Sequence, residues 1–232
     1  MSSFEKISKF WQNFWYHNKW KVIVTLFFIV VFGVCITQMF TKEKYDVSIL
    51  YAGPEYIEEN SHRTAADLLA NVLGDDYDEN GKKNAQLIDI VILSDEQIKE
   101  REEAAKEQDI AFYYDKGSRN SSLMQISTYI SSGETIVCLL DEYVYKKLLE
   151  EGAFRTVESV LGYAPDNLND PYSVLLGDTD LYKAYSALSV IPADTHVCII
   201  KMPYSFGSEC QEKIYENHIS FFKNLLEFEL SD

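Results

Sequence analysis

Residues 22–41 read VIVTLFFIVVFGVCITQMFT, a stretch of twenty residues without a charged side chain. Lys19 and Lys21 precede this stretch, and Lys42 and Lys44 follow it. A helix of this length rises about 30 Å at 1.5 Å per residue, which matches the hydrocarbon core of a lipid bilayer. The stretch therefore predicts one transmembrane helix, which separates a short tail (residues 1–21) from a polar domain (residues 42–232).

The charges on the two sides of this helix have opposite sign. Residues 1–21 carry four lysines and one glutamate, a net charge of +3, whereas the residues after position 41 carry 17 basic and 36 acidic side chains, a net charge of −19. Basic flanks of a membrane helix stay in the cytoplasm. We therefore expect a single-pass protein of the cell membrane, with a cytoplasmic N-terminus and an extracytoplasmic acidic domain.

Aromatic and basic residues gather directly before the apolar stretch. All three tryptophans of the chain, Trp11, Trp15 and Trp20, lie there beside Lys19 and Lys21. Amphipathic rings settle at the level of the lipid headgroups, and lysines favour anionic lipid. We predict that these five residues lie at the inner membrane interface.

Two other kinds of N-terminal segment fit this stretch less well. A cleaved signal peptide has an apolar core of about 7 to 15 residues and a cleavage site made of small residues, whereas this stretch is longer and ends in TQMFT. A lipid-modified cysteine requires a small residue directly before it, and Val34 precedes Cys35. We expect an uncleaved helical anchor.

The composition after the helix is that of one globular domain. Hydrophobic residues make up 47% of the chain and charged residues 25%, and no long Pro, Gly or Ser tract interrupts it. Its negative charge opposes binding to nucleic acid. The electrostatically compatible partners are neutral or cationic.

No pattern of metal ligands or disulfides stands out. The sequence GDDYDENGKKN at residues 74–84 is similar to a calcium loop in its order of acidic and amide residues, but it lacks the closing bidentate glutamate. We expect a solvated loop there, with no metal and no cofactor. Cys138, Cys198 and Cys210 are odd in number and lack CxxC spacing, so the pattern leaves open whether any two of them are bridged.

Apolar strands alternate with helices in the first part of the domain. This alternation predicts an α/β fold with a mainly parallel sheet, because parallel strands need helical crossovers. Together with the anchor, the expected fold is one transmembrane helix and one three-layer α/β domain. We predict strands at 45–51, 87–93 and 135–140, helices at 57–73, 94–108, 141–150 and from Ser208 onward, a strand or extended crossover at 110–115, an irregular excursion after residue 155, and a hairpin of strands 188–191 and 196–200.

The segment SSGETIVCLLDEYVYKKLLEEGAF at residues 131–154 resembles extracellular solute-binding proteins of the periplasmic-binding type. In both, a helix ends in a short turn, a buried strand ends in two acidic residues, and a helix leads to a Gly-Ala-Phe phrase. The resemblance implies a fold like one lobe of a periplasmic binding protein (type II-like) and implies ligand binding. The matching positions are Ser132, Gly133 and Glu134 in the turn, Asp141 and Glu142 at the strand exit, and Gly152, Ala153 and Phe154 in the phrase.

The candidate site follows from the expected topology. Ligands of open α/β sheets bind beyond the carboxyl ends of the strands. Each candidate residue there also serves as a turn residue or helix cap. The candidates are Gly53, Pro54 and Tyr56 after the first strand, Ser94 and Asp95 after the second, and Asp141, Glu142 and Tyr143 after the third.

Two functions stay open. The sequence contains no GxSxG, SxxK, HExxH or phosphate-loop motif, so we do not expect an enzyme. The first function is binding of a small neutral or cationic ligand, or of a partner membrane protein, in a transport-associated or sensing accessory role. The alternative is a structural or assembly subunit of a cell-envelope membrane complex that binds no ligand.

Overall fold

The computed structural model describes residues 3–41, 45–202, 207 and 209–229, without the side chains of residues 3–13, 38–41 and 210. The chain forms two compact units, Met1–Lys44 and Tyr45–Asp232. Trp11 and Cys210 therefore lie outside the described side chains, and Ser208 lies outside the described residues.

The first unit is a single helix, α1 (Ser3–Thr41). Its segment Phe14–Thr37 is long and apolar enough to cross a membrane, and none of its most apolar window is buried. The side chains that would face lipid are thus open to the surroundings. The helix also includes the aromatic tail, so it begins well before residue 22.

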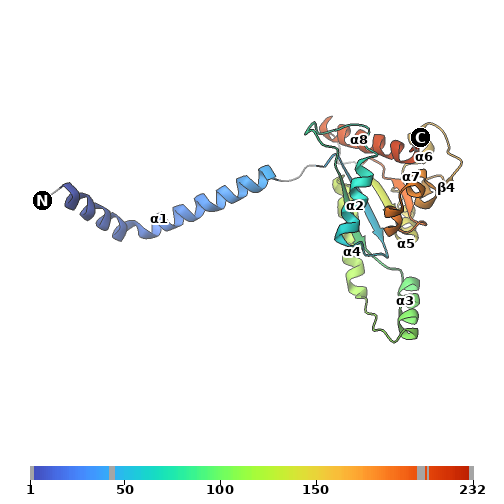
Figure 1. Ribbon diagram of the computed structural model, residues 1–232, viewed down its shortest axis with the longest axis horizontal. Coiled ribbons are helices and arrows are strands. Elements are labelled where there is room, and N and C mark those ends of the chain that lie inside the picture. Colours follow the sequence, from blue (N-terminus) through green and yellow to red (C-terminus); the bar gives the residue numbers. More distant parts are fainter. Residues whose placement is uncertain (1–2, 42–44, 203–206, 208, 230–232) are drawn as a thin grey trace. The chain divides into compact units, whose positions relative to one another are not determined.

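The second unit is a mixed α/β domain with one six-stranded sheet (Figure 1). Its strands are β1 (Val47–Gly53), β2 (Ala85–Val91), β3 (Val137–Leu140), β4 (Leu168–Asp170), β5 (Ser173–Leu175) and β6 (His196–Ile199). Its helices are α2 (Glu59–Ala70), α3 (Asp95–Glu107), α4 (Lys116–Ser132), α5 (Glu142–Glu150), α6 (Val157–Leu161), α7 (Asp180–Ala184) and α8 (Glu209–Leu226), with 3-10 turns η1 (Leu176–Asp178) and η2 (Ser186–Val190).

The sheet is parallel in one half and antiparallel in the other. The strand order is β2-β1-β3-β6-β5-β4, and β1 pairs in parallel with both β2 and β3. From β6 outward the pairing is antiparallel. The predicted parallel strands are confirmed for β1 to β3, where helices form the crossovers, whereas the segment after residue 155 returns through short connections that reverse the chain direction.

Helices cover both faces of the sheet. Alternate strand residues face opposite sides: Ile49 and Tyr51 join a core under α2, α6, α7 and α8, whereas Leu50 and Ala52 join a core under α4 and α5. The central strands β3 and β6 are buried along their whole length. Their uninterrupted apolar sequence reflects this burial from both sides.

Three sequence predictions are wrong in the later part of the domain. Residues 110–115 form no strand, and the extended-crossover alternative describes them. Residues 188–191 do not form a hairpin with β6, because Leu188 lies in η2 and β6 instead pairs with β3 and β5. The expected irregular excursion contains β4 and β5.

Candidate functional site

A polar pocket lies where the parallel strands end. Because β1, β2 and β3 run in the same direction, the segments after them meet at one edge of the sheet. The pocket has a volume of about 260 Å³. Its lining comes from the loop after β1, from α3, from the start of α5 and from the segment before β6: Pro54, Glu55, Gln97, Glu100, Arg101, Asp141, Pro192, Asp194 and Thr195.

The end of β1 is shaped by a buried tyrosine. The Tyr51 ring is fully buried, and its hydroxyl accepts a hydrogen bond from the Glu55 backbone N–H at 3.3 Å. A Cβ atom at Gly53 would lie 2.7 Å from the Tyr51 Oη, so only glycine fits beside the ring. Burial raises the pKa of Tyr51. Its hydroxyl therefore stays protonated and holds the Glu55 backbone at the pocket wall.

A second wall is formed by two linked helix starts. Ser94 and Gln97 form a capping box at α3, as predicted, with Ser94 N donating to Gln97 Oε1 at 2.8 Å. Gln97 Nε2 donates to Asp141 Oδ2 at 2.9 Å, while Asp141 Oδ1 accepts from the Tyr143 N–H at 2.8 Å and caps α5. The Asp141 cap is also confirmed. These bonds fix the starts of α3 and α5 against each other across the pocket.

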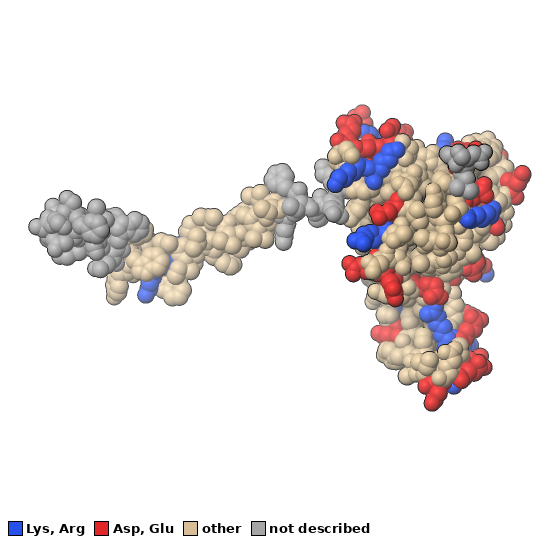
Figure 2. Space-filling view, viewed as in Figure 1, with Lys and Arg blue, Asp and Glu red and all other residues tan. Residues whose placement is uncertain are grey.

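The pocket carries an excess of negative charge. Arg101 donates through Nη2 to the Pro54 carbonyl at 3.0 Å and to Glu55 Oε1 at 2.7 Å. Against this one guanidinium, the lining contains four carboxylates, a formal net charge of −3. Figure 2 shows acidic side chains over the visible face of the domain as well. The local potential therefore favours a cationic group.

The remaining predicted residues lie near this edge but do not line the pocket. Tyr56 is 73% exposed, and Ser94 is buried as a helix cap. Asp95 is bound by Arg119 at 2.8 Å, which lowers the pKa of its carboxyl. Tyr143 lies beneath the guanidinium of Arg119, 5.9 Å from its ring centroid. Of the eight predicted residues, Pro54 and Asp141 alone line the pocket, and Gly53 and Glu142 act through their neighbours.

Glu142 takes part in a network that the sequence did not indicate. Its Oε2 lies 2.6 Å from His196 Nε2, and His196 Nδ1 lies 3.0 Å from Ser173 Oγ. The Tyr145 ring stacks on the imidazole at 4.0 Å, and its hydroxyl donates to Asp170 at 2.6 Å. The residue types are those of a hydrolase triad, but Ser173 is fully buried, so its hydroxyl cannot reach a substrate. The network instead links α5 to β4, β5 and β6.

Three carboxylates come together beside the loop that is similar to a calcium loop. One oxygen from each of Asp46, Asp76 and Asp78 lies within 4.8 Å of the others, and Asp46 comes from the residues before β1. These residues could hold a divalent cation with oxygen ligands. Asp46 already accepts the N–H groups of Tyr77, Asp78 and Asn84, so it also closes the loop without an ion.

Two cysteines face each other on neighbouring strands. Cys138 and Cys198 pair across β3 and β6 and are both fully buried free thiols. Burial raises the pKa of both thiols. Neither is a reactive nucleophile, because reactivity requires the thiolate.

The predicted interface residues lie on the exposed surface of α1. Trp15 is 52% exposed and Trp20 is 71% exposed. Lys19 and Lys21 are also exposed. Comparisons with protein-family models, with curated proteins and with solved structures find no match to this chain. The site is therefore interpreted from its own residues.

Proposed function

We propose that this chain is a single-pass membrane protein whose acidic domain lies outside the cell and binds a small cationic ligand at the carboxyl ends of β1 and β3. The observation that carries the proposal is the pocket with four carboxylates and one guanidinium. The role is that of an accessory protein in transport or sensing. The resemblance of residues 131–154 to solute-binding proteins supports the same assignment.

The size and charge of the pocket narrow the class of ligand. Its volume of about 260 Å³ lies below the range of about 300–1,000 Å³ for drug-sized ligands. A short amine fits this space, and its charge is attracted by Glu100 and Asp194. Neither of these exposed carboxylates serves as a helix cap, so they are available to a ligand.

Titration calorimetry on the full chain in lipid nanodiscs tests the proposal. We expect heat of binding from short amines, such as putrescine, spermidine and lysine, and none from glucose or glutamine. Glu100→Gln and Asp194→Asn should each weaken amine binding about two- to fivefold, the effect of one exposed charge. Glu103→Gln, on the same helix but outside the pocket, is the matched control. Loss of the same size in the control contradicts a pocket site.

A second candidate function is supported by a projecting arm. The helix α3 and the loop of residues 108–115 extend away from the sheet (Figure 1). At the end of this arm Tyr113 is 87% exposed and Ile110 is 60% exposed. Large exposed apolar residues at such a tip favour contact with a partner protein, as expected of an assembly subunit.

The two functions separate in one comparison of variants. If the arm binds a subunit, Ile110→Ser with Tyr113→Ser should lower the apparent mass of the complex on native gels of mildly solubilised membranes. Tyr56→Ser, which removes an equally exposed tyrosine elsewhere, is the control. An unchanged mass for the arm variant rules out this second function, and amine titration of the same variant reports separately on the pocket.

A further inference from the structure

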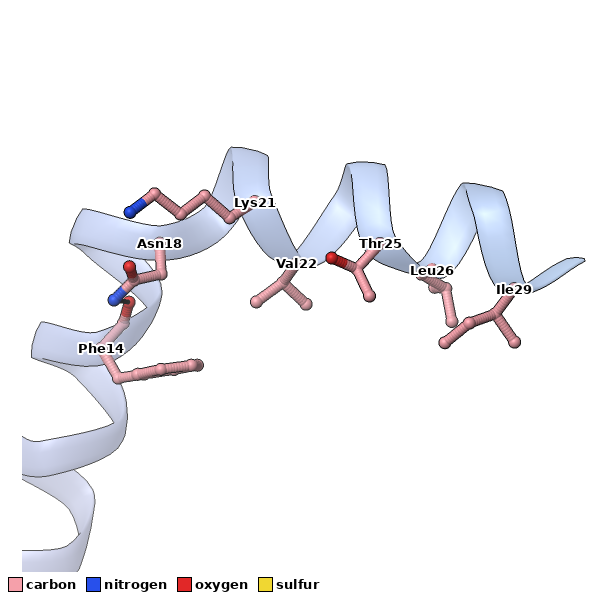
Figure 3. Close-up of a pocket in the computed structure, with 7 residues that line it drawn as sticks. All are labelled: Phe14, Asn18, Lys21, Val22, Thr25, Leu26 and Ile29. Carbon is pink, nitrogen blue, oxygen red and sulfur yellow. Dashed lines mark hydrogen bonds between the residues drawn. The ribbon is translucent and has the colours of Figure 1, made fainter.

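One face of α1 forms a hollow with a polar end and an apolar end. Its lining residues recur every three or four positions, so they share a single helix face. The hollow has a volume of about 400 Å³ and lies where the helix changes direction (Figure 3). The lining residues are Phe14, Asn18, Lys21, Val22, Thr25, Leu26 and Ile29.

The polar end presents hydrogen-bond donors and a positive charge. Asn18 Nδ2 donates to the Phe14 carbonyl at 3.2 Å, which orients the amide. The Lys21 side chain extends back along the helix toward Asn18 (Figure 3). Within residues 14–37, whose side chains are described, Lys19 and Lys21 are the charged residues other than histidine, and no carboxylate opposes them. This end of the hollow is therefore suited to an anionic group.

The apolar end continues along the helix for the length of an acyl chain. Val22, Leu26 and Ile29 point to the same side of the helix in Figure 3. Eight residues separate Lys21 from Ile29, a rise of about 12 Å, against about 15 Å for half of a bilayer core. A ligand that matches both ends has an anionic head and a long apolar tail.

We propose that this hollow binds one anionic phospholipid of the inner leaflet, with its phosphate at Lys21 and Asn18 and an acyl chain along Val22 to Ile29. This inference rests on the proposed membrane anchoring and is independent of the pocket in the domain. A partner helix or a second copy of α1 would bury Lys21 without a described carboxylate to neutralise it, which is costly in lipid. The charge of Lys21 therefore favours the lipid.

Tryptophan fluorescence reads this segment selectively. All three tryptophans lie at positions 11, 15 and 20, so emission from the whole chain reports on the region around the hollow. The full chain is placed in phosphatidylcholine nanodiscs that contain a small, equal mole fraction of either brominated phosphatidylglycerol or brominated phosphatidylcholine. One basic residue at the membrane enriches anionic lipid about fivefold, so the brominated anionic lipid should quench more strongly.

Variants at the two lysines separate a site from general attraction. Lys21→Gln should abolish the excess quenching by the anionic lipid, and Lys21→Arg should keep it. Lys19→Gln removes the same charge two residues away but does not line the hollow, so it should keep most of the excess. Circular dichroism confirms that each variant keeps its helix.

Three results would overturn the proposal. Equal quenching by both brominated lipids in the wild-type chain means that the hollow does not select anionic lipid. Equal losses in Lys19→Gln and Lys21→Gln reduce the effect to surface charge. Excess quenching that appears only when protein is diluted into more lipid means that a second copy of the chain occupies this face. Loss of amine binding by the domain would leave this inference unchanged.

Discussion

A buried neutral histidine holds the last helix against the central strand of the parallel half. His218 on α8 is 3% exposed, and its Nε2 accepts the backbone N–H of Ser48 in β1 at 3.2 Å. Its Nδ1 lies 2.8 Å from the Ile214 carbonyl and therefore carries the proton. Both ring nitrogens are satisfied only when the imidazole is neutral. Burial lowers the pKa of His218 below its ordinary value.

The sign of the pH effect follows from this lowered pKa. Below about pH 6.5 the unfolded chain takes up a proton at His218 while the folded chain does not, so protonation favours unfolding. The contribution of His218 to the free energy of unfolding is fully present above that pH. It is lost as pH falls toward the folded-state pKa, with a limiting slope of about 1.4 kcal/mol per pH unit.

Urea unfolding of residues 45–232, which contain both hydrophobic cores, measures this slope by circular dichroism. His218→Gln carries an amide that does not titrate, so its stability should vary less between about pH 7.5 and pH 5.5 than that of the wild type. His218→Ala should cost about 1–3 kcal/mol at neutral pH, because the Ser48 N–H loses its acceptor. Parallel curves for the wild type and His218→Gln would refute the argument.

Three further variants probe the edge of the sheet. Gly53→Ala should destabilise the domain by about 1–3 kcal/mol in the same urea assay, because the buried Tyr51 ring cannot move away from the new methyl group. Ser94→Ala should cost about 1 kcal/mol and speed hydrogen exchange in the first turn of α3, whereas unchanged exchange would contradict the capping box. The pKa of Glu142 is lowered by its lysine and histidine partners, so its small contribution to stability, below about 1 kcal/mol, should be lost as pH falls through that pKa. A carboxyl NMR titration of Glu142 with a midpoint at or above the ordinary glutamate value would exclude this effect.

Local patterns in the sequence predicted those parts of the fold that local physics determines. The caps at Ser94 and Asp141 are stated by neighbouring residues and are present as expected. The strands β1, β2 and β3 carry long apolar runs, so their existence and shared direction could also be predicted. The common edge of the sheet followed from that direction.

Long-range pairing accounts for the parts that could not be predicted. The strands β4 and β5 are three residues long, too short for a period-two pattern. The partner of β6 depends on where the chain returns after residue 155, and it returns beside β3. For the same reason the pocket residues Asp194 and Thr195 could not be placed at the edge, although Pro54 and Asp141 could.

The two units have opposite electrical characters, and this difference connects the two proposed sites. The tail before the apolar helix is basic and the domain after it is strongly acidic. Anionic lipid attracts the first and repels the second, so the charges favour one orientation of the helix and keep the domain surface off the headgroups. The same acidic surface attracts cations and raises their concentration near the pocket. A short amine therefore gains from the whole domain as well as from the four carboxylates, whereas a neutral ligand gains from neither.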